Sequence, residues 1–158
     1  MTGIRFKNYF LAVISALSMV PAIAQEGVIG YVKTVAAQAS VVSAGQTTPA
    51  KPGLALHLGD VLKTGVSASM GVIFKDSTTM SMGPDTELVV DEYLFAPEKG
   101  DLKLGAKLSK GSLYYISGVI AKLKPESVSI KTPTGMIGVR GTQFLAKSAQ
   151  ISRASSRL

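Results

Sequence analysis

The sequence predicts an all-β domain in which short strands form two packed antiparallel sheets or a flattened β-roll, preceded by a signal-peptide helix. The chain has 158 residues, 46% apolar and 17% charged, which is typical of one soluble globular domain. Its 16 glycines and 7 prolines favour many tight turns over long helices. From Val28 onward, apolar residues alternate in short runs between glycine, proline and aspartate, the period-two pattern of half-buried strands.

The first 24 residues have the pattern of a secretory signal peptide. Arg5 and Lys7 precede an apolar run from Tyr9 to Val20, and Ala22-Ile23-Ala24 offers the small-x-small pattern that signal peptidase accepts, with the cut after Ala24. The run is shorter than the roughly 20 residues that a bilayer core requires, and a buried core helix is the alternative interpretation. Removal of both cations leaves 15 of the 17 basic residues against 10 acidic ones, a net charge of +5. We therefore expect a periplasmic or secreted protein.

The composition restricts the chemistry open to the chain. It has no cysteine and a single histidine, His57, so few of the usual nucleophiles, bases and metal ligands are present. Its stability must come from a packed core, turns and hydrogen bonds, because disulfides are excluded. We expect no metal, no cofactor and no enzymatic activity. Because Gln25 stands where a lipoprotein needs cysteine, we expect no lipid anchor. No run beyond residue 24 is long and apolar enough to cross a bilayer, so we expect no stable membrane span after signal removal.

The first part of the mature chain is predicted to form six short strands. Gly59-Asp60 and Thr64-Gly65 have turn composition, Lys75-Asp76-Ser77 resembles a hairpin connection, and Gly83-Pro84-Asp85 stops a strand. Residues 44–53 are predicted to form a loop. The predicted strands are Val28–Val35, Ala39–Ser43, Leu54–Leu58, Val61–Leu62, Val72–Phe74 and Thr78–Met82.

The second part continues the same pattern with one helical turn. Apolar residues at helix spacing, ended by Pro125, predict that turn over Gly118–Lys124. Pro97–Gly100 closes the most hydrophobic run, and Thr132–Gly135 forms a turn. The predicted strands are Leu88–Phe95, Leu102–Leu104 with Leu108, Leu113–Ile116, Val128–Ile130 and Ile137–Leu145. Residues 148–158 are predicted to be a flexible basic tail.

Four spaced motifs resemble the FecR domain, from about Val28 to Leu145. They are Leu58–Gly65, Gly71–Thr78, Gly83–Leu88, and Thr132-Pro133 with Gly138–Phe144, which ends in an Arg-Gly-Thr-x-Phe phrase. The resemblance implies an all-β periplasmic domain over residues 25–147. Name-giving members sense a loaded outer-membrane iron-siderophore receptor and signal to a sigma factor. A signal peptide is predicted here instead of their membrane span, so the chain looks more like the stand-alone secreted members.

The candidate motif residues are Gly59, Asp60, Asp76, Arg140, Gly141 and Thr142. Arg140 stands among apolar residues in a strand-like run, so its guanidinium must face water or find a partner. We expect it to clamp a turn by pairing with Asp60 or Asp76. The alternative is that it meets an anionic group of a partner or ligand. Gly141 is expected to permit a bulge or close strand approach.

Other polar residues are expected to lie on the surface. His57 should face solvent, and Asp91 and Glu92 should point to opposite faces of a strand rather than form a carboxylate dyad. Export argues against a nucleic-acid partner for the lysine-rich middle of the chain, although tyrosines lie nearby. The lysines are expected to form a solvated face that also guards edge strands against pairing. They are Lys99, Lys103, Lys107, Lys110, Lys122, Lys124 and Lys131.

The leading functional hypothesis is an exported, non-enzymatic binding, scaffold or sensor module of the cell envelope. Its partner would be an envelope protein or polymer, and exposed edge strands are the expected contact surface. One alternative is a regulator of envelope signalling or iron-uptake gene expression that works through a membrane partner. The other is an envelope glycan hydrolase, which predicts a cleft with two carboxylates.

Overall fold

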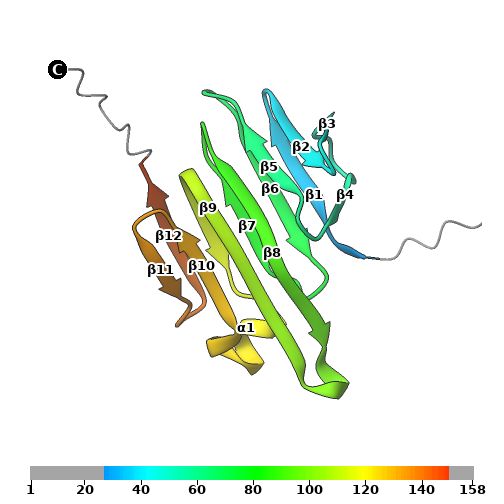
Figure 1. Cartoon of the computed structure of the whole chain (residues 1–158), viewed down its shortest axis with the longest axis vertical. Coiled ribbons are helices and arrows are strands. Elements are labelled where there is room, and N and C mark those ends of the chain that lie inside the picture. The colour runs from blue at the N-terminus through cyan, green and yellow to red at the C-terminus, as the bar shows by residue number, and fades with distance from the viewer. Residues whose placement is uncertain (1–26, 150–158) are drawn as a thin grey trace, which may run out of the picture.

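The computed structural model describes residues 27–149, which contain twelve β-strands and one short α-helix (Figure 1). The predicted signal peptide with Ala22 and Ala24, and the predicted tail from residue 150 on, lie outside the described residues. The strands are β1 (Val28–Ala36), β2 (Ala39–Ser43), β3 (Gln46–Pro49), β4 (Ala55–His57), β5 (Val61–Thr64), β6 (Ser69–Phe74), β7 (Thr79–Met82), β8 (Glu87–Ala96), β9 (Asp101–Ile116), β10 (Val128–Thr132), β11 (Gly135–Gly138) and β12 (Gln143–Ser148). The helix is α1 (Val119–Leu123), and 3-10 turns cover Pro97–Lys99 and Pro125–Ser127.

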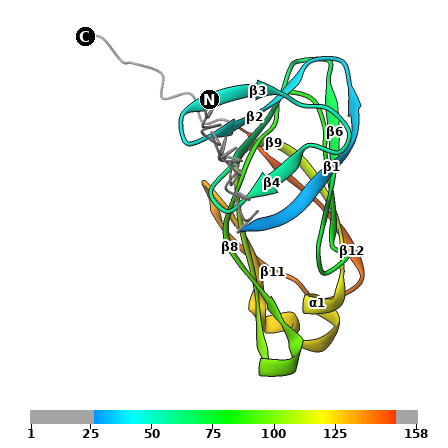
Figure 2. The same cartoon turned by 90° about the vertical axis from the view of Figure 1, so that its right-hand side faces the viewer.

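The strands form one sheet with the order β3-β2-β5-β8-β9-β7-β6-β1-β4, which curls around the core (Figure 2). The first part of β9 pairs with β8 and, in parallel, with β10, whereas its second part pairs with β7 and β12. β11 continues from β10 as a hairpin. The all-β prediction is confirmed. Two separate packed sheets are not confirmed, because β9 joins the half of the sheet that contains β8 and β10 to the half that contains β7 and β12.

Gly111 lets β9 cross from one half of the sheet to the other. Its φ is +90°, and a Cβ atom there would collide with Thr86, the residue before β8. Only glycine tolerates both the positive φ and the close approach. The two strands that the sequence predicts over residues 102–108 and 113–116 are therefore one strand of 16 residues.

The core consists of the inward side chains of each strand. Leu104, Leu108 and Leu113 of β9 are fully buried, as are Met80 of β7 and Leu88 of β8. Burial of each such side chain contributes roughly 1.5–3 kcal/mol. The period-two alternation of the sequence is thus the pattern that assembles this core.

Local turn geometry explains where the predicted elements differ from the observed ones. Residues 44–53 are not entirely loop, because Ala44 and Gly45 both have positive φ, the requirement of a two-residue hairpin turn, and β3 follows. The predicted strand Ile137–Leu145 is divided into β11 and β12 by residues 139–142, where Gly141 has φ +123°. The predicted helical turn is confirmed as α1, and Pro125 follows its C-cap, Lys124.

Candidate functional site

Gly59 and Asp60 form the turn between β4 and β5. Gly59 has φ +86° and its N–H donates to the Val90 carbonyl over 2.9 Å. The buried Asp60 carboxylate accepts a hydrogen bond from the backbone N–H of His57, 2.8 Å away. The His57 side chain is 42% exposed, with Nδ1 3.7 Å from Oδ2 of Asp60. Asp60 therefore stabilises its own turn, and it does not meet Arg140.

Asp76 is fully buried and joins the β6–β7 turn to α1. Its carboxylate accepts hydrogen bonds from the hydroxyl of Thr78 (2.6 Å) and from the backbone N–H groups of Thr78 (3.2 Å) and Ile120 (3.3 Å). Its carbonyl accepts from the N–H of Val119 over 2.7 Å. The carboxylate thus caps the N-terminus of the helix from another part of the chain. The Tyr93 hydroxyl donates to Oδ1 over 3.2 Å.

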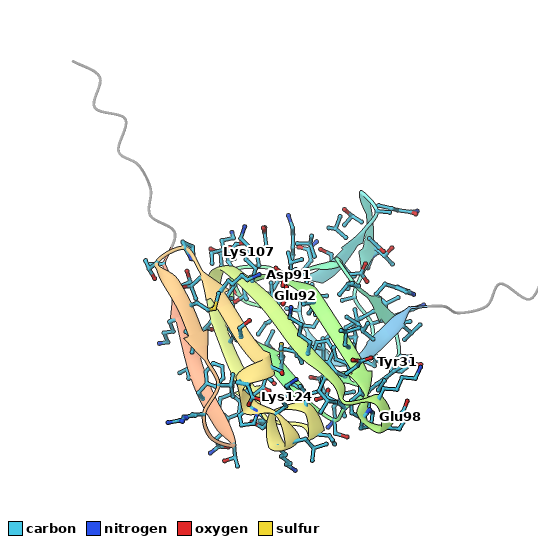
Figure 3. All side chains as sticks on the ribbon, turned by 60° about the horizontal axis from the view of Figure 1, so that its bottom comes forward. Tyr31, Asp91, Glu92, Glu98, Lys107 and Lys124 are labelled. Atoms are coloured by element: carbon cyan, nitrogen blue, oxygen red, sulfur yellow. The ribbon has the colours of Figure 1, made fainter. Side chains whose placement is uncertain are left out.

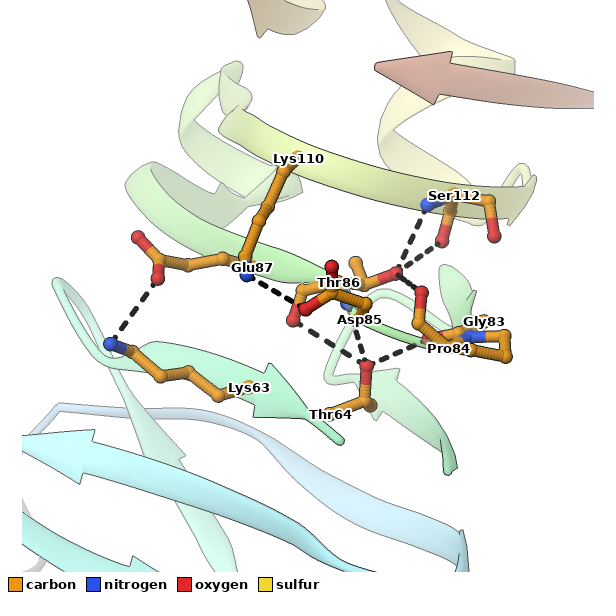
Figure 4. A network of polar contacts seen from close by, with 9 residues as sticks. All are labelled: Lys63, Thr64, Gly83, Pro84, Asp85, Thr86, Glu87, Lys110 and Ser112. Carbon is orange, nitrogen blue, oxygen red and sulfur yellow. Dashed lines mark hydrogen bonds and ion pairs between the residues drawn. The ribbon is translucent and has the colours of Figure 1, made fainter. Parts of the chain in front are cut away.

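A second polar network connects β5, the β7–β8 turn and β9 (Figure 4). The Thr64 hydroxyl donates to the Gly83 carbonyl (2.7 Å) and accepts from the N–H of Thr86 (2.9 Å). The Thr86 hydroxyl accepts from the N–H of Ser112 over 3.0 Å. Thr64 and Thr86 were not among the predicted candidates, although both lie in the motifs that resemble FecR. Both threonines are buried, so the network holds the fold together.

Arg140, Gly141 and Thr142 lie in the exposed segment between β11 and β12. The predicted pairing of Arg140 with Asp60 or Asp76 is wrong: among residues 27–149, no carboxylate lies within ion-pair distance of its guanidinium. The segment is held through its backbone, because the Ser117 hydroxyl donates to the Gly141 carbonyl and the Ser117 N–H donates to the Thr142 carbonyl, each over 2.8 Å. Arg140 borders an open hollow of about 380 Å³ beside β10 and β11.

Asp91 and Glu92 lie on the same side of the sheet, contrary to the prediction (Figure 3). A Cβ atom at Gly105 would lie 2.8 Å from Oε2 of Glu92 and 3.1 Å from Oδ1 of Asp91. The cause is a bulge, because the β8–β9 register shifts between Val90 and Glu92. Each carboxylate forms an ion pair with a lysine: Lys131 Nζ lies 3.1 Å from Asp91, and Lys103 Nζ lies 3.3 Å from Glu92.

The outer edge of β12 carries unpaired backbone groups. Within residues 27–149, β12 pairs with β9 alone, in the register Leu145↔Tyr114. The Ser117 N–H binds the Thr142 carbonyl, and antiparallel ladders alternate between bonded and non-bonded pairs. It follows that Phe144, Ala146 and Ser148 bond to β9, whereas the N–H and C=O groups of three residues point away from it. These are Gln143, Leu145 and Lys147, which we call the β12 edge.

Exposed apolar side chains stand directly beside the β12 edge. Leu145 is 60% exposed, and its neighbours on β9, Tyr114 and Ile116, are 38% and 39% exposed. We call these three residues the outer patch. The Tyr114 hydroxyl donates to Oε1 of Gln143 over 2.8 Å, which links the side chains of the two strands. On the inner face, Phe144 stacks on the buried Tyr115 with ring centroids 5.0 Å apart, so the strand is anchored to the core.

Three of the other free edges in the described part of the chain are less suited to strand pairing. Residues 91–96 of β8 pair with β9 alone and form a further edge, which begins with a bulge and two carboxylates. β3 is wholly exposed, polar and ends in Pro49, which has no N–H to donate. β4 has three residues and β11 has four, whereas β12 has six. The β12 edge is therefore the longest of these four edges. Lys147 is its one charged residue, and such charges disfavour unwanted strand pairing.

The fold and its exposed features define a class: an all-β domain that presents a sheet edge with an apolar border. No helix within residues 27–149 has the length and apolar character needed to cross a membrane. The model of the family described as FecR protein matches residues 60–157, and the chain belongs to the FecR family, as its motifs predicted. Searches of curated proteins and of solved structures gave no match.

Proposed function

We propose that this protein is an exported, non-enzymatic module of the bacterial cell envelope that binds an extended segment of a partner protein. Three features support the proposal: the signal-peptide pattern of residues 1–24, membership of a family associated with envelope signalling, and the β12 edge. The β12 edge carries the proposal, because an incoming strand would satisfy its unpaired backbone groups.

Binding by strand addition uses both parts of this surface. The backbone groups of Gln143, Leu145 and Lys147 supply hydrogen bonds without regard to the partner's sequence. The outer patch supplies apolar contact with every second side chain of the added strand. Together the two parts make affinity depend on an extended segment with alternating apolar side chains in the partner, which suits a scaffold or sensor domain.

Crosslinking in intact cells tests the proposal. A photoreactive amino acid placed at the position of Leu145 should capture a partner on irradiation, and mass spectrometry of the product identifies it. The matched control places the same group at Leu94, which is 54% exposed on β8, away from the β12 edge. Equal capture at both positions, or none at Leu145, would contradict the proposal.

Two alternative functions, a signalling regulator and a glycan hydrolase, predict different experimental results. Capture of a sigma-regulatory membrane protein would favour a regulator of envelope signalling or iron uptake over a scaffold. A glycan hydrolase gains one observation, the adjacent carboxylates of Asp91 and Glu92. Release of sugars from purified envelope glycans, lost in Asp91→Asn, would replace the binding proposal with an enzymatic one.

A further inference from the structure

We infer that the strand received by the β12 edge is β12 of a second copy, so that the chain forms a two-fold symmetric dimer with a continuous sheet. This inference rests on the proposed function and names the partner at the same surface. A two-fold interface places one patch against itself, so the patch must be self-complementary. β12 meets this condition in one register.

The register is centred on Leu145. The N–H and C=O of Leu145 point outward, so Leu145 of each copy forms a hydrogen-bonded pair with Leu145 of the other when the two strands run antiparallel. Counting outward from this centre, Gln143 of each copy lies opposite Lys147 of the other. All the outward backbone groups of the β12 edge are then paired.

The side chains that face each other in this register are compatible. The lysines are opposite glutamines, so no like charges meet, and the Leu145 side chains meet at the two-fold axis. The outer patches of the two copies, each made of Tyr114, Ile116 and Leu145, then lie next to each other on the same face of the continuous sheet. A register shifted by two residues toward the C-terminus would centre on Lys147 and place two lysines face to face. Charge therefore disfavours the Lys147-centred register, and the Leu145-centred register is the one that pairs all three outward residues of each copy with those of the other.

The contact consists of β12 and the outer patch of each copy. Two paired strands of six residues bury a small surface area compared with the roughly 1,200–2,000 Å² that stable interfaces bury. We therefore expect a reversible dimer, with monomer at low concentration.

A disulfide between copies tests the geometry. The natural chain has no cysteine, so a thiol introduced by Leu145→Cys cannot form a disulfide within its own chain, and a disulfide-linked dimer must join two copies at this position. Hydrogen-bonded antiparallel pairs have Cα atoms about 5.5 Å apart, which is within the range of a disulfide. The full chain should be expressed in its host, purified from the envelope and oxidised. Leu145→Cys should give a dimer on a non-reducing gel, whereas the similarly exposed control Leu94→Cys should stay monomeric.

Opposite charges at Gln143 test the register without a crosslink. Gln143→Glu places a carboxylate opposite Lys147 of the second copy and should tighten the dimer, whereas Gln143→Lys places two cations there and should weaken it. Each symmetric pair occurs twice, so we expect shifts of about 2- to 10-fold in the dissociation constant, in opposite directions. Sedimentation equilibrium from about 1 to 200 µM measures both. Shifts in the same direction would overturn the register.

Failure of the inference differs from failure of the proposed function. A chain that stays monomeric over this range, with no disulfide in Leu145→Cys, overturns self-association. If the probe at Leu145 then still captures another protein in cells, the proposed function holds and the β12 edge serves that protein. A dimer in solution with no capture in cells supports self-association and contradicts the proposed cellular role.

Discussion

The Tyr93 hydroxyl and the Asp76 carboxylate lie 3.2 Å apart and join β8 to the turn between β6 and β7. The same hydroxyl accepts a hydrogen bond from the Asp76 backbone N–H over 3.0 Å, so the two residues are connected in both directions. The Tyr93 ring also packs on Phe74 with centroids 5.7 Å apart. One buried acid thus holds together a strand, a turn and a helix.

Asp76→Ala should destabilise the fold by about 3 kcal/mol or more, because three donors on Thr78 and Ile120 lose their acceptor in the interior. Urea unfolding measures the change. The matched control Asp101→Ala, at the exposed start of β9, should change stability by less than about 0.5 kcal/mol. Equal effects of the two substitutions would show that the Asp76 network contributes nothing specific.

Tyr93 should make the fold sensitive to alkali. Burial and then the negative charge of Asp76 raise the pKa of Tyr93 well above its usual value. A tyrosine in the unfolded chain ionises near pH 10, while the folded state keeps Tyr93 neutral. The stability from this group is therefore complete below about pH 10 and is lost as the pH rises above it.

Tyr93→Phe should then retain more of its neutral-pH stability at about pH 11 than the parent chain does, when urea midpoints are compared with those at about pH 8. Burial also raises the pKa of Tyr115, so part of the alkaline loss remains in this variant. Tyr31→Phe, on an exposed ring, is the control. An identical alkaline loss in Tyr93→Phe and the parent would contradict the argument.

Thr86→Val should cost about 1–3 kcal/mol although it preserves the side-chain shape. The substitution removes the acceptor of the Ser112 N–H inside the network of Figure 4 and leaves that donor unsatisfied. The control Thr47→Val, on the exposed strand β3, should be neutral or slightly stabilising, because valine favours strands. Thermal unfolding of the pair gives the comparison.

Gly111→Ala should be among the most damaging single changes, at about 3 kcal/mol or more. A methyl group there combines a positive φ with a collision against Thr86. Gly135→Ala is the matched control, because its φ is not positive and the space around it is open. Equal melting temperatures for the two variants would show that β9 does not need its bend.

Alternation in the sequence was enough to predict most of the strands. β1, β2, β7, β8 and α1 follow from period-two or helical spacing and their flanking turn residues. β3 was missed because it is polar and depends on a two-residue turn rather than on alternation. The break between β11 and β12 was missed because it combines the positive φ of Gly141 with hydrogen bonds from Ser117, which is distant in the sequence.

The candidate site depends on pairing, which one sequence does not contain. Whether β12 lies at an edge is decided by the order of all the strands, so the hypothesis of edge contacts did not identify which edge. Asp91 and Glu92 share a side only because a bulge opposite Gly105 shifts the alternation. Arg140 has the surroundings of a buried arginine in the sequence, yet the break in the strand turns it to the surface.

Arg140→Ala should leave the free energy of unfolding within about 0.5 kcal/mol of the parent, because the guanidinium is exposed and has no carboxylate partner in the described residues. Asp60→Ala should cost about 1–2 kcal/mol, because it removes the buried carboxylate that accepts the hydrogen bond of the His57 N–H.

The two substitutions should also be additive, since the residues do not touch. Urea unfolding of both single variants and of the double variant measures this directly. A coupling of 1 kcal/mol or more, an order-of-magnitude threshold for residues in contact, would show that Arg140 and Asp60 interact in solution. Additivity would leave Arg140 free to contact a partner, and the fold-neutral Arg140→Ala chain could then be compared with the parent in the cellular crosslinking experiment.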